Sequence, residues 1–445
     1  MPVNRVVLAE YFITDEITLL FFIRDDFDEP EVIEIPRPVR EIREFVLVNF
    51  KEQRDENDRV LIKTGEMIQQ LDDRVFQEFF EPFVAPLISE SRKGGPVSRE
   101  GDLIWIVPHD MLHYIPLHAV KVEGRYLIDR NPVCYTPSAS VMKYCRTKRK
   151  GRREKGLVLA DSRDDLWHAR EEAVTIAGLF GTTPYLGLQA TKSLLKEKLE
   201  TDRAELDILH FSCHGYFDAS QPLRSGIMLA APQDAPTDDA KWNLTAEEIF
   251  GLRLEADLVT LSACESGVNQ YRLGDELIGL TRALIYAGTP SVLVSLWAVD
   301  DLSTNLLMRH FYQQLAGSTK AEALRAAQSY VRDLTAKDVI GYCERRLAEL
   351  NGPEDARQII LFQLDRANAQ VAAGDLQAAI ASYREIGPRL KQLARDQAER
   401  LSEELDNRLR LLEFKSEVSP AIDYNARPFE SMYYWAAFIL VGDWK

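Results

Sequence analysis

Two apolar stretches, LDILHFSCHG at residues 206–215 and LVTLSACESG at residues 258–267, decide how this sequence folds. Each starts as a run typical of a buried β-strand and then ends in a reactive side chain, His214 in the first and Cys264 in the second. In open α/β sheets, sites form beyond the carboxyl ends of the strands. Two parallel neighbouring strands would therefore bring His214 and Cys264 together at one edge of a sheet.

The sequence around these stretches alternates between strand-like and helix-like patterns. Further strands are expected at 157–160 and 291–297, and helices at 170–179, 273–287 and 304–315. Short apolar runs alternating with amphipathic segments are typical of a parallel sheet covered by helices. We therefore predict an α/β fold with a mainly parallel sheet flanked by helices.

The first 150 residues are expected to form a separate α/β half. Residues 1–35 contain β-rich runs that predict a hairpin, and residues 37–55 and 64–90 have helical periodicity. The basic, glycine-containing run at 146–155 breaks the pattern and is interpreted as a linker between two halves. A solvated loop is the plain interpretation of this run, and a processing site is the sharper alternative.

The region before the last strand is almost entirely helical. Residues 363–386 resemble one tetratricopeptide-type (TPR-like) hairpin with a turn at 373–375, although an ordinary helical insertion remains an alternative, because no second copy is evident. The expected domains are an N-terminal half at 1–150, a catalytic half at 151–345, a helical insertion at 346–424 and a final strand segment at 425–445.

The composition excludes several classes of protein. With 46% apolar and 28% charged residues, the chain can bury a core and is not disordered throughout. Its net charge of −16 disfavours nucleic acid as a partner, since an acidic surface repels polyanions. We find no stretch with the length of a transmembrane helix and no signal-peptide pattern. The five cysteines match no disulfide or zinc framework, which favours reduced thiols. We expect a cytoplasmic protein without membrane association, metal or cofactor.

His214 and Cys264 are the residue types of a nucleophilic cysteine site. The thiolate, not the thiol, is the nucleophile, and a neighbouring imidazole can take the thiol proton and later give it to a leaving amine. The backbone amides of Gly215 and Cys264 are the expected oxyanion hole. No residue that would orient the far nitrogen of His214 is evident in the sequence, and a main-chain carbonyl would suffice.

Plainer interpretations of these residues exist. A single cysteine after an apolar strand is usually a core residue, and a single histidine is usually a satisfied polar group. The conjunction of two strand ends with nearby glycines favours the chemical interpretation. Cys213 is the competing nucleophile, but adjacent strand residues point to opposite faces, so we expect Cys213 to pack in the core.

Several ordered motifs resemble one known family, the CHAT domain family. They are HFSCHGYFD (210–218), SGIMLA (225–230), LSACESG (261–267), the long segment 274–301, the closing YYWAAFILVGDW (433–444) and, in the first half, IVPHDMLHYIPLHAV (106–120). The resemblance covers about residues 1–345 and 425–445. It implies a fold similar to caspases and separases, a pseudo-protease-like first half, and peptide-bond hydrolysis by a dyad of His214 and Cys264.

Weaker signals concern the substrate pocket and a metal. Ser262, Glu265 and Asp300 lie near the expected site and are candidates to line a substrate pocket, although Asp300 is favoured as the N-cap of a helix. The histidines of the segment 106–120 are His109, His113 and His118. They lack the glutamate of a zinc helix and have prolines among them, so structural roles are favoured.

The function predicted from the sequence is a caspase-like cysteine endopeptidase. Its partners are expected to be a protein substrate and a regulatory protein that acts through the helical insertion. A catalytically silent interaction module is the alternative from another class, and a different acyl-transfer hydrolase using the same thiol is a third.

Overall fold

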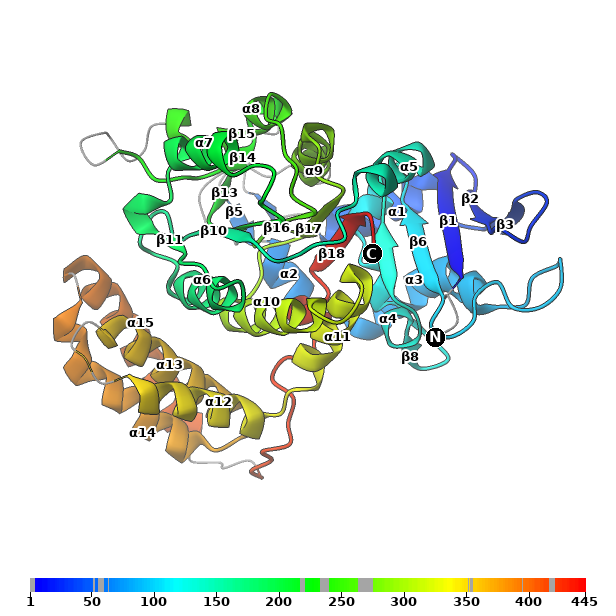
Figure 1. The fold of residues 1–445 in the computed structure, drawn as a ribbon. Helices are drawn as coiled ribbons and strands as arrows, with labels where there is room; N and C mark the ends of the chain where they lie inside the picture. The colour runs from blue at the N-terminus through cyan, green and yellow to red at the C-terminus, as the bar shows by residue number, and fades with distance from the viewer. Residues whose placement is uncertain are drawn as a thin grey trace. The chain divides into compact units, whose positions relative to one another are not determined.

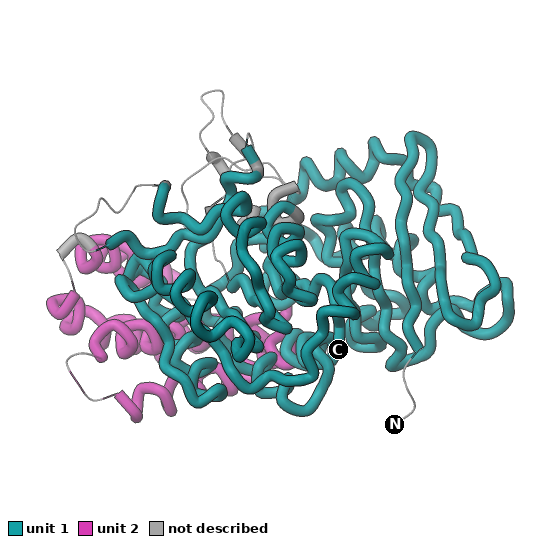
Figure 2. Tube along the Cα trace, turned by 45° about the horizontal axis from the view of Figure 1, so that its top comes forward, with its two compact units in different colours: residues 1–329, 432–445 teal, residues 330–431 magenta. Residues whose placement is uncertain are grey.

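The computed structural model of the 445-residue chain describes most of its length (Figure 1). The described residues are 5–50, 53–54, 60–62, 64–216, 221–232, 240–262, 275–350, 352, 355–393, 395–415 and 421–445. The chain divides into two compact units, which are residues 1–329 with 432–445, and residues 330–431 (Figure 2). In the described parts of the chain, no helix combines the length and the apolar character needed to cross a bilayer.

A large sheet forms the centre of the first unit. Among the described residues it has eleven strands, in the order β11-β10-β12-β16-β17-β18-β9-β6-β1-β2-β3. Their bounds are β1 Val6–Ile13, β2 Thr18–Ile23, β3 Glu31–Ile35, β6 Leu103–Val107, β9 Val133–Tyr135, β10 Gly156–Ala160, β11 Tyr185–Leu186, β12 Ile208–Ser212, β16 Leu258–Leu261, β17 Ser291–Ser295 and β18 Phe438–Gly442. The central strands are buried along their whole length, as expected for strands covered on both faces.

Strand directions show how the sheet is assembled. From β11 to β17 all neighbours are parallel, and β9, β6 and β1 are also parallel to one another. The last strand, β18, pairs antiparallel with β17 and parallel with β9, so it joins the two groups into one sheet. The predicted fold class, a mainly parallel sheet flanked by helices with a helical block before the last strand, is confirmed. The predicted N-terminal hairpin is the antiparallel pair β1–β2.

Helices cover both faces of this sheet (Figure 1). On one face α6 packs against α10, and on the other α8 packs against α9. The helices that begin in the first unit are α1 Val39–Asn49, α2 Thr64–Gln70, α3 Asp73–Ile88, α4 Leu127–Arg130, α5 Ala139–Lys148, α6 Trp167–Leu179, α7 Lys192–Thr201, α8 Ala246–Phe250, α9 Asp275–Ala287, α10 Asp301–Leu315, α11 Lys320–Asp333 and α16 Met432–Trp435.

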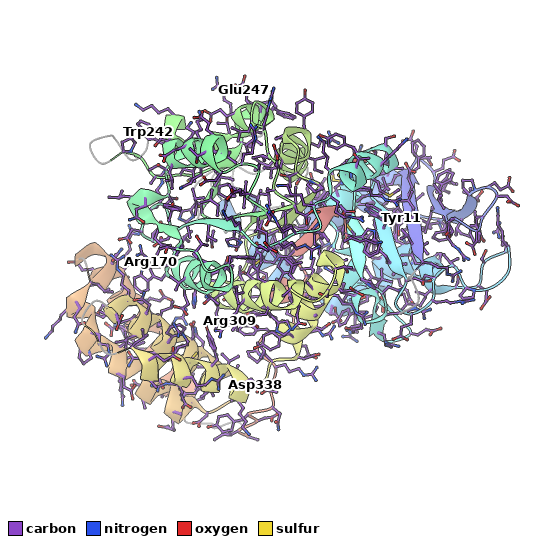
Figure 3. All side chains as sticks on the ribbon, viewed as in Figure 1. Tyr11, Arg170, Trp242, Glu247, Arg309 and Asp338 are labelled. Carbon is purple, nitrogen blue, oxygen red and sulfur yellow. The ribbon has the colours of Figure 1, made fainter. Side chains whose placement is uncertain are left out.

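Short elements complete the first unit. Small sheets are formed by β13 Gly215–Tyr216, β14 Gly226–Ile227 and β15 Leu244–Thr245, by β4 Gln53–Arg54 and β5 Val60–Ile62, and by β7 Lys121–Val122 and β8 Arg125–Tyr126. Side chains also tie the helices to the large sheet. Tyr11 of β1 is buried, and its hydroxyl donates a hydrogen bond of 2.8 Å to the carbonyl of Phe83 in α3 (Figure 3). A buried hydroxyl with a partner fixes α3 on the sheet without an unsatisfied polar group.

The second unit is a succession of helices. Its described helices beyond α11 are α12 Ala336–Glu349, α13 Ala356–Ala372, α14 Leu376–Ile386 and α15 Arg395–Lys415, and each packs on the next. Gly374 has a φ of +78° in the turn between α13 and α14, where the sequence predicted a turn. The predicted hairpin thus has helical neighbours on both sides, which supply the surface that a single repeat needs to bury its own face.

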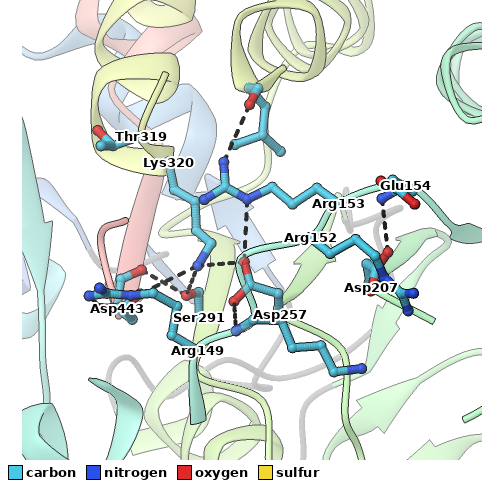
Figure 4. A network of polar contacts seen from close by, with 12 residues as sticks. Arg149, Arg152, Arg153, Glu154, Asp207, Asp257, Ser291, Thr319, Lys320 and Asp443 are labelled. Carbon is cyan, nitrogen blue, oxygen red and sulfur yellow. Dashed lines mark hydrogen bonds and ion pairs between the residues drawn. The ribbon is translucent and has the colours of Figure 1, made fainter. Parts of the chain in front are cut away.

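The basic run after α5 is docked onto buried carboxylates (Figure 4). The ion pairs are Arg149–Asp443, Arg152–Asp207 and Arg153–Asp257, and all three aspartate side chains are fully buried. The interpretation of this run as a solvated loop is therefore wrong for Arg149 and Arg153, whereas Arg152 stays about half exposed. Burying an unpaired carboxylate costs free energy, so each of the three aspartates needs a cationic partner. The arginines supply that partner.

Candidate active site

The two strands that carry the predicted dyad are parallel neighbours. Phe211 of β12 lies opposite Leu261 of β16, and His214 and Cys264 each follow three residues later. His214 is placed at the carboxyl end of β12 and is only 3% exposed. Cys264 lies outside the described residues. The register places the carboxyl ends of β12 and β16 at the same edge of the sheet, because parallel strands end on the same side.

An aspartate that sequence reasoning missed contacts His214. The Oδ1 of Asp165 lies 2.8 Å from the Nε2 of His214. Asp165 follows β10, the strand next to β12, so it comes from a third strand end at the same edge. The sequence could have indicated an acidic residue at this edge, because the strand at 157–160 runs directly into a segment with three aspartates, ADSRDD.

The loop that carries Asp165 is held in an unusual backbone conformation. Asp161 and Asp164 have φ values of +51° and +59°, which non-glycine residues rarely adopt. The carboxylate of Asp161 accepts a hydrogen bond of 2.8 Å from the backbone amide of Leu166, and Arg170 bridges Asp161 and Asp164. Arg170 extends from α6 (Figure 3). Strain of this kind persists only when neighbouring contacts impose it, and here those contacts fix the position of Asp165.

The electrostatics of the pair favour an ionised Asp165. Burial acts to raise the pKa of the Asp165 carboxyl, but the hydrogen bond and the charge of His214 outweigh burial and hold that pKa below its ordinary value. The carboxylate therefore remains negative at neutral pH. A negative charge at this position stabilises a positive charge on the imidazole.

The competing nucleophile, Cys213, is a core residue as predicted. Its side chain is fully buried, with its Sγ 3.6 Å from the carbonyl oxygen of Leu159, and burial raises the pKa of its thiol to about 12. A thiol with such a pKa is not a nucleophile at neutral pH.

The small sheet after His214 orients the amide of Gly215. Met228 donates its amide hydrogen to the carbonyl of His214 at 2.9 Å, and Gly215 lies opposite Ile227 in the next pair of the ladder. In an antiparallel ladder, the residues next to a hydrogen-bonded pair turn their amides away from the partner strand. The amide of Gly215 thus points away from β14.

The structure describes two of the three residues that were predicted to line a substrate pocket. Ser262 is buried, and its hydroxyl donates to the Oε2 of Glu172 at 3.3 Å. Asp300 is the N-cap of α10, because its carboxylate accepts the amide of Ser303 at 2.8 Å. Glu265 lies outside the described residues. The N-cap interpretation of Asp300 is confirmed, and a role of these three residues toward substrate stays a prediction.

Glu172 belongs to a buried polar network beneath the site. Its Oε1 lies 2.7 Å from the Nε2 of His210, and the other ring nitrogen of His210 lies 3.1 Å from the hydroxyl of Tyr312. Thr260 of β16 also contacts that hydroxyl, at 2.7 Å. The network therefore joins β12, β16, α6 and α10 directly below the residues that enter the site, and a satisfied buried network makes this edge rigid.

The histidines of the segment 106–120 are not arranged as a zinc helix. Residues Asp110–Tyr114 form a short 3₁₀ helix, and the Nδ1 of His109 accepts the amide of Ile13 at 3.3 Å. His118 is buried, with its ring nitrogens 3.0 Å from the Tyr135 hydroxyl and 3.1 Å from the Gln328 amide nitrogen. Within the part of the chain that the structure describes, no cluster of three or more His, Cys, Asp or Glu side chains is placed to hold a metal ion.

An apolar pocket lies against β17, β18 and β9 and extends from the row of Val294 toward the opposite edge of the sheet, where β9 and β6 end. Val294 of β17 lies opposite Leu261, and Ile439 of β18 lies opposite Val294, so these side chains continue the row from β12 and β16. The pocket is lined by Pro108, His113, Tyr114, Tyr135, Thr136, Pro137, Thr281, Val294, Leu296, Ile439 and Val441. Its volume of about 50 Å³ has room for about four water-sized groups. A branched aliphatic side chain has that size.

These features define an α/β protein with a histidine–aspartate pair at the carboxyl edge of a mainly parallel sheet, beside the strand that leads into a cysteine. The chain belongs to the CHAT domain family, which matches residues 67–443. The resemblance found in the sequence motifs is thereby confirmed.

Two curated relatives and two solved structures are similar to parts of this chain. Tetratricopeptide repeat protein 28 of Mus musculus is 29% identical over 194 residues, or 36% of this chain and 8% of that protein. Its Homo sapiens counterpart is 26% identical over 252 residues, or 48% of this chain and 10% of that protein. The chain thus spans about a tenth of the length of these relatives or less.

The structures are the Saccharomyces cerevisiae separase–securin complex and the Arg-specific cysteine proteinase gingipain R. The separase chain has a TM-score of 0.45 at 10% identity, with 73% of this chain and 29% of that chain covered. Gingipain R has a TM-score of 0.36 at 11% identity, with 65% of this chain and 70% of that chain covered.

Proposed function

We propose that this chain is a cysteine endopeptidase in which Cys264 is the nucleophile, His214 is the general base and Asp165 is a positioning residue. The observation that carries the proposal is the 2.8 Å contact between Asp165 and His214 at the edge where β16 leads into Cys264. A carboxylate that holds one nitrogen of a histidine fixes the orientation of the ring and the position of its protons. A histidine with only a structural role has no need of a partner presented by a strained loop.

In this proposal the two ring nitrogens of His214 have different roles. Because Nε2 faces Asp165, Nδ1 is the nitrogen that takes the proton of the Cys264 thiol. The thiolate then adds to the carbonyl carbon of a peptide bond. The imidazolium returns the proton to the leaving amine as the carbon–nitrogen bond breaks, and water hydrolyses the resulting thioester by the reverse sequence of proton transfers.

The amide of Gly215 is proposed to stabilise the oxyanion, together with the amide of Cys264. Its direction away from β14 supports this role, since that amide is not used in the ladder. Ser262, Glu265 and Asp300 are retained as candidates near the substrate. The apolar pocket beside β17 supports an aliphatic side chain in the substrate.

The burial of His214 supports control of this site by a partner. A side chain that is 3% exposed is reached by a protein substrate only after its cover opens. The helical unit at 330–431 is a candidate surface for such a partner, because stacked helical hairpins form extended binding surfaces. We propose a protein substrate and a regulatory protein as partners, and the cytoplasm as the compartment.

A thiol-reactive peptide tests the proposal. In the presence of cellular extract as a source of the partner, an acyloxymethyl ketone peptide with an aliphatic residue should label the parent chain at Cys264, and mass spectrometry of the digest locates the adduct. His214→Ala should abolish labelling while the circular dichroism spectrum stays unchanged. Labelling that persists in His214→Ala, or that falls on another cysteine, would reject the dyad.

A catalytically silent interaction module is the second candidate. The helical succession α12–α15 favours it, as does the similarity to relatives that are named for tetratricopeptide repeats. The labelling experiment separates the two functions. A silent module would show no selective reaction at Cys264 in the presence or absence of cellular extract.

A further inference from the structure

A large groove lies between α5 and α9 in the first unit. Its volume is about 930 Å³, within the range of binding sites for organic ligands and peptide segments. It is lined by Pro137, Val141, Tyr144, Lys148, Phe250, Gly251, Leu252, Arg253, Leu254, Glu255, Arg282, Ile285, Tyr286, Ala287 and Gly288. Both helices lie on the same side of the sheet (Figure 1). The groove lies apart from the His214 site and is not needed for its chemistry.

The groove exposes aromatic side chains from both walls. Tyr286 of α9 is 70% exposed and Tyr144 of α5 is 40% exposed. Phe250 packs edge-on against Tyr286, with ring centroids 5.4 Å apart. Exposed aromatic rings gathered in a concave surface are typical of sites that bind a partner, since rings bury a large area with little loss of entropy.

Three cations line the same groove without a counter-charge. Lys148, Arg253 and Arg282 are exposed, and among the side chains that the structure describes no carboxylate forms an ion pair with any of them. The acidic residue of the groove, Glu255, is paired with Arg203 at 3.1 Å. The chain as a whole has a net charge of −16, so a group of cations without carboxylate partners differs from the acidic character of the chain.

We propose that this groove binds an acidic peptide segment of a partner protein, with an aromatic or aliphatic residue as its anchor. The three cations attract the carboxylates of the segment, and the rings of Tyr144 and Tyr286 pack on its apolar residue. A nucleic acid fits less well, because the net charge of −16 on the chain repels a long polyanion. A small inorganic anion would leave the aromatic surface uncovered.

The groove shares helix α9 with the apolar pocket beside β17. Arg282 and Tyr286 of α9 line the groove, while the adjacent residue, Thr281, lines that apolar pocket. The helix also begins at Asp275, eleven residues after Cys264. A segment bound between α5 and α9 would therefore act on the peptidase through α9, and this regulatory role rests on the proposed function, whereas binding itself does not.

Peptide selection tests the binding. A phage library of short random peptides is selected against the full-length Cys264→Ala chain, which makes the result independent of catalysis. We expect enriched peptides to combine Asp or Glu with Phe, Tyr, Trp or Leu. Fluorescence polarisation of an enriched peptide should show a dissociation constant at least about tenfold higher for Arg282→Glu and for Lys148→Glu. Lys143→Glu, on α5 but outside the groove lining, is the matched control and should bind as the parent does.

Several outcomes would overturn the proposal. One is the absence of enriched peptides whose binding depends on Arg282. Another is equal binding by peptides with the acidic residues replaced by Ser, which would indicate a purely apolar site. Competition by heparin at the same strength as by the peptide would indicate a polyanion site. Concentration-dependent self-association that Arg282→Glu abolishes would assign the groove to a second copy of the chain.

Discussion

The Nζ of Lys320 lies 2.8 Å from the Oδ2 of Asp257, and neither side chain is exposed to solvent. Lys320 also lies 3.6 Å from the carboxylate of Asp443 and donates to the hydroxyl of Ser291 at 2.8 Å. Asp257 precedes β16, Ser291 begins β17 and Asp443 follows the antiparallel β18, so the cluster closes the edge where β16 and β17 begin and β18 ends (Figure 4). The proposed catalytic residues occupy the opposite edge.

Asp257→Ala tests the contribution of this cluster. The substitution leaves Lys320 and Arg153 buried or half-buried without their shared carboxylate, and we expect the unfolding free energy of the first unit to fall by about 3–5 kcal/mol. Urea unfolding followed by tryptophan fluorescence measures this unit alone, because all six tryptophans lie in it. Arg203→Ala is the control, since Arg203 and its partner Glu255 are both exposed, and its loss should cost less than about 1 kcal/mol. Equal losses in the two variants would contradict the prediction.

Asp165→Asn tests the positioning of His214. An amide has the shape of the carboxylate but not its charge, so the imidazolium loses its counter-ion and the ring loses its preferred orientation. We expect kcat to fall about 10- to 100-fold with little change in KM. Peptide hydrolysis under saturating and limiting substrate separates the two constants. Asp202→Asn, which removes a surface carboxylate paired with Lys198, should match the parent. A change confined to KM would argue for a substrate contact instead.

His118 makes the stability of the first unit depend on pH. Burial lowers the pKa of His118 to about 3 in the folded chain, from an ordinary value of 6.5. Below pH 6.5, His118 therefore binds a proton in the unfolded chain but not in the folded chain. The unfolding free energy should fall as the pH is lowered from 6.5 toward 3, by about 1.4 kcal/mol per pH unit from this group.

His118→Gln removes that dependence while it keeps polar atoms near Tyr135 and Gln328. Urea titrations at several pH values should give a shallower decline for the variant than for the parent below pH 6.5. Above that pH the two curves should run parallel, because the histidine is neutral in both states. Identical slopes in the acidic range would show that His118 is not the group responsible.

Leu296→Ala tests the apolar pocket as a determinant of substrate choice. Loss of the side chain enlarges a pocket of about 50 Å³, so substrates with a branched aliphatic residue should lose about tenfold in kcat/KM, while larger aromatic residues gain. Cleavage profiles of a peptide library before and after the substitution measure the shift. Leu188→Ala, at a leucine that is 62% exposed, should leave the profile unchanged. An unchanged profile for Leu296→Ala would remove the pocket from the substrate site.

Much of the fold follows from local patterns in the sequence. The apolar runs that became β12, β16 and β17 are short and unbroken, which predicts strands covered on both sides, and the structure confirms this. The turn at Gly374 was also predictable, because Ala373, Gly374 and Asp375 separate two amphipathic arms. Both features depend on residues close together in the chain.

The partner of His214 did not follow from such patterns. Asp165 is 49 residues away in the chain, and only the pairing of β10 with β12 brings it to the imidazole. The same holds for the arginines after α5, whose charge suggested solvent exposure although their carboxylates lie buried at distant strand ends. The sequence by itself determined which segments are strands and which reactive residues end them. Tertiary structure decided which charges meet, because long-range ion pairs depend on sheet order and register, which local periodicity does not encode.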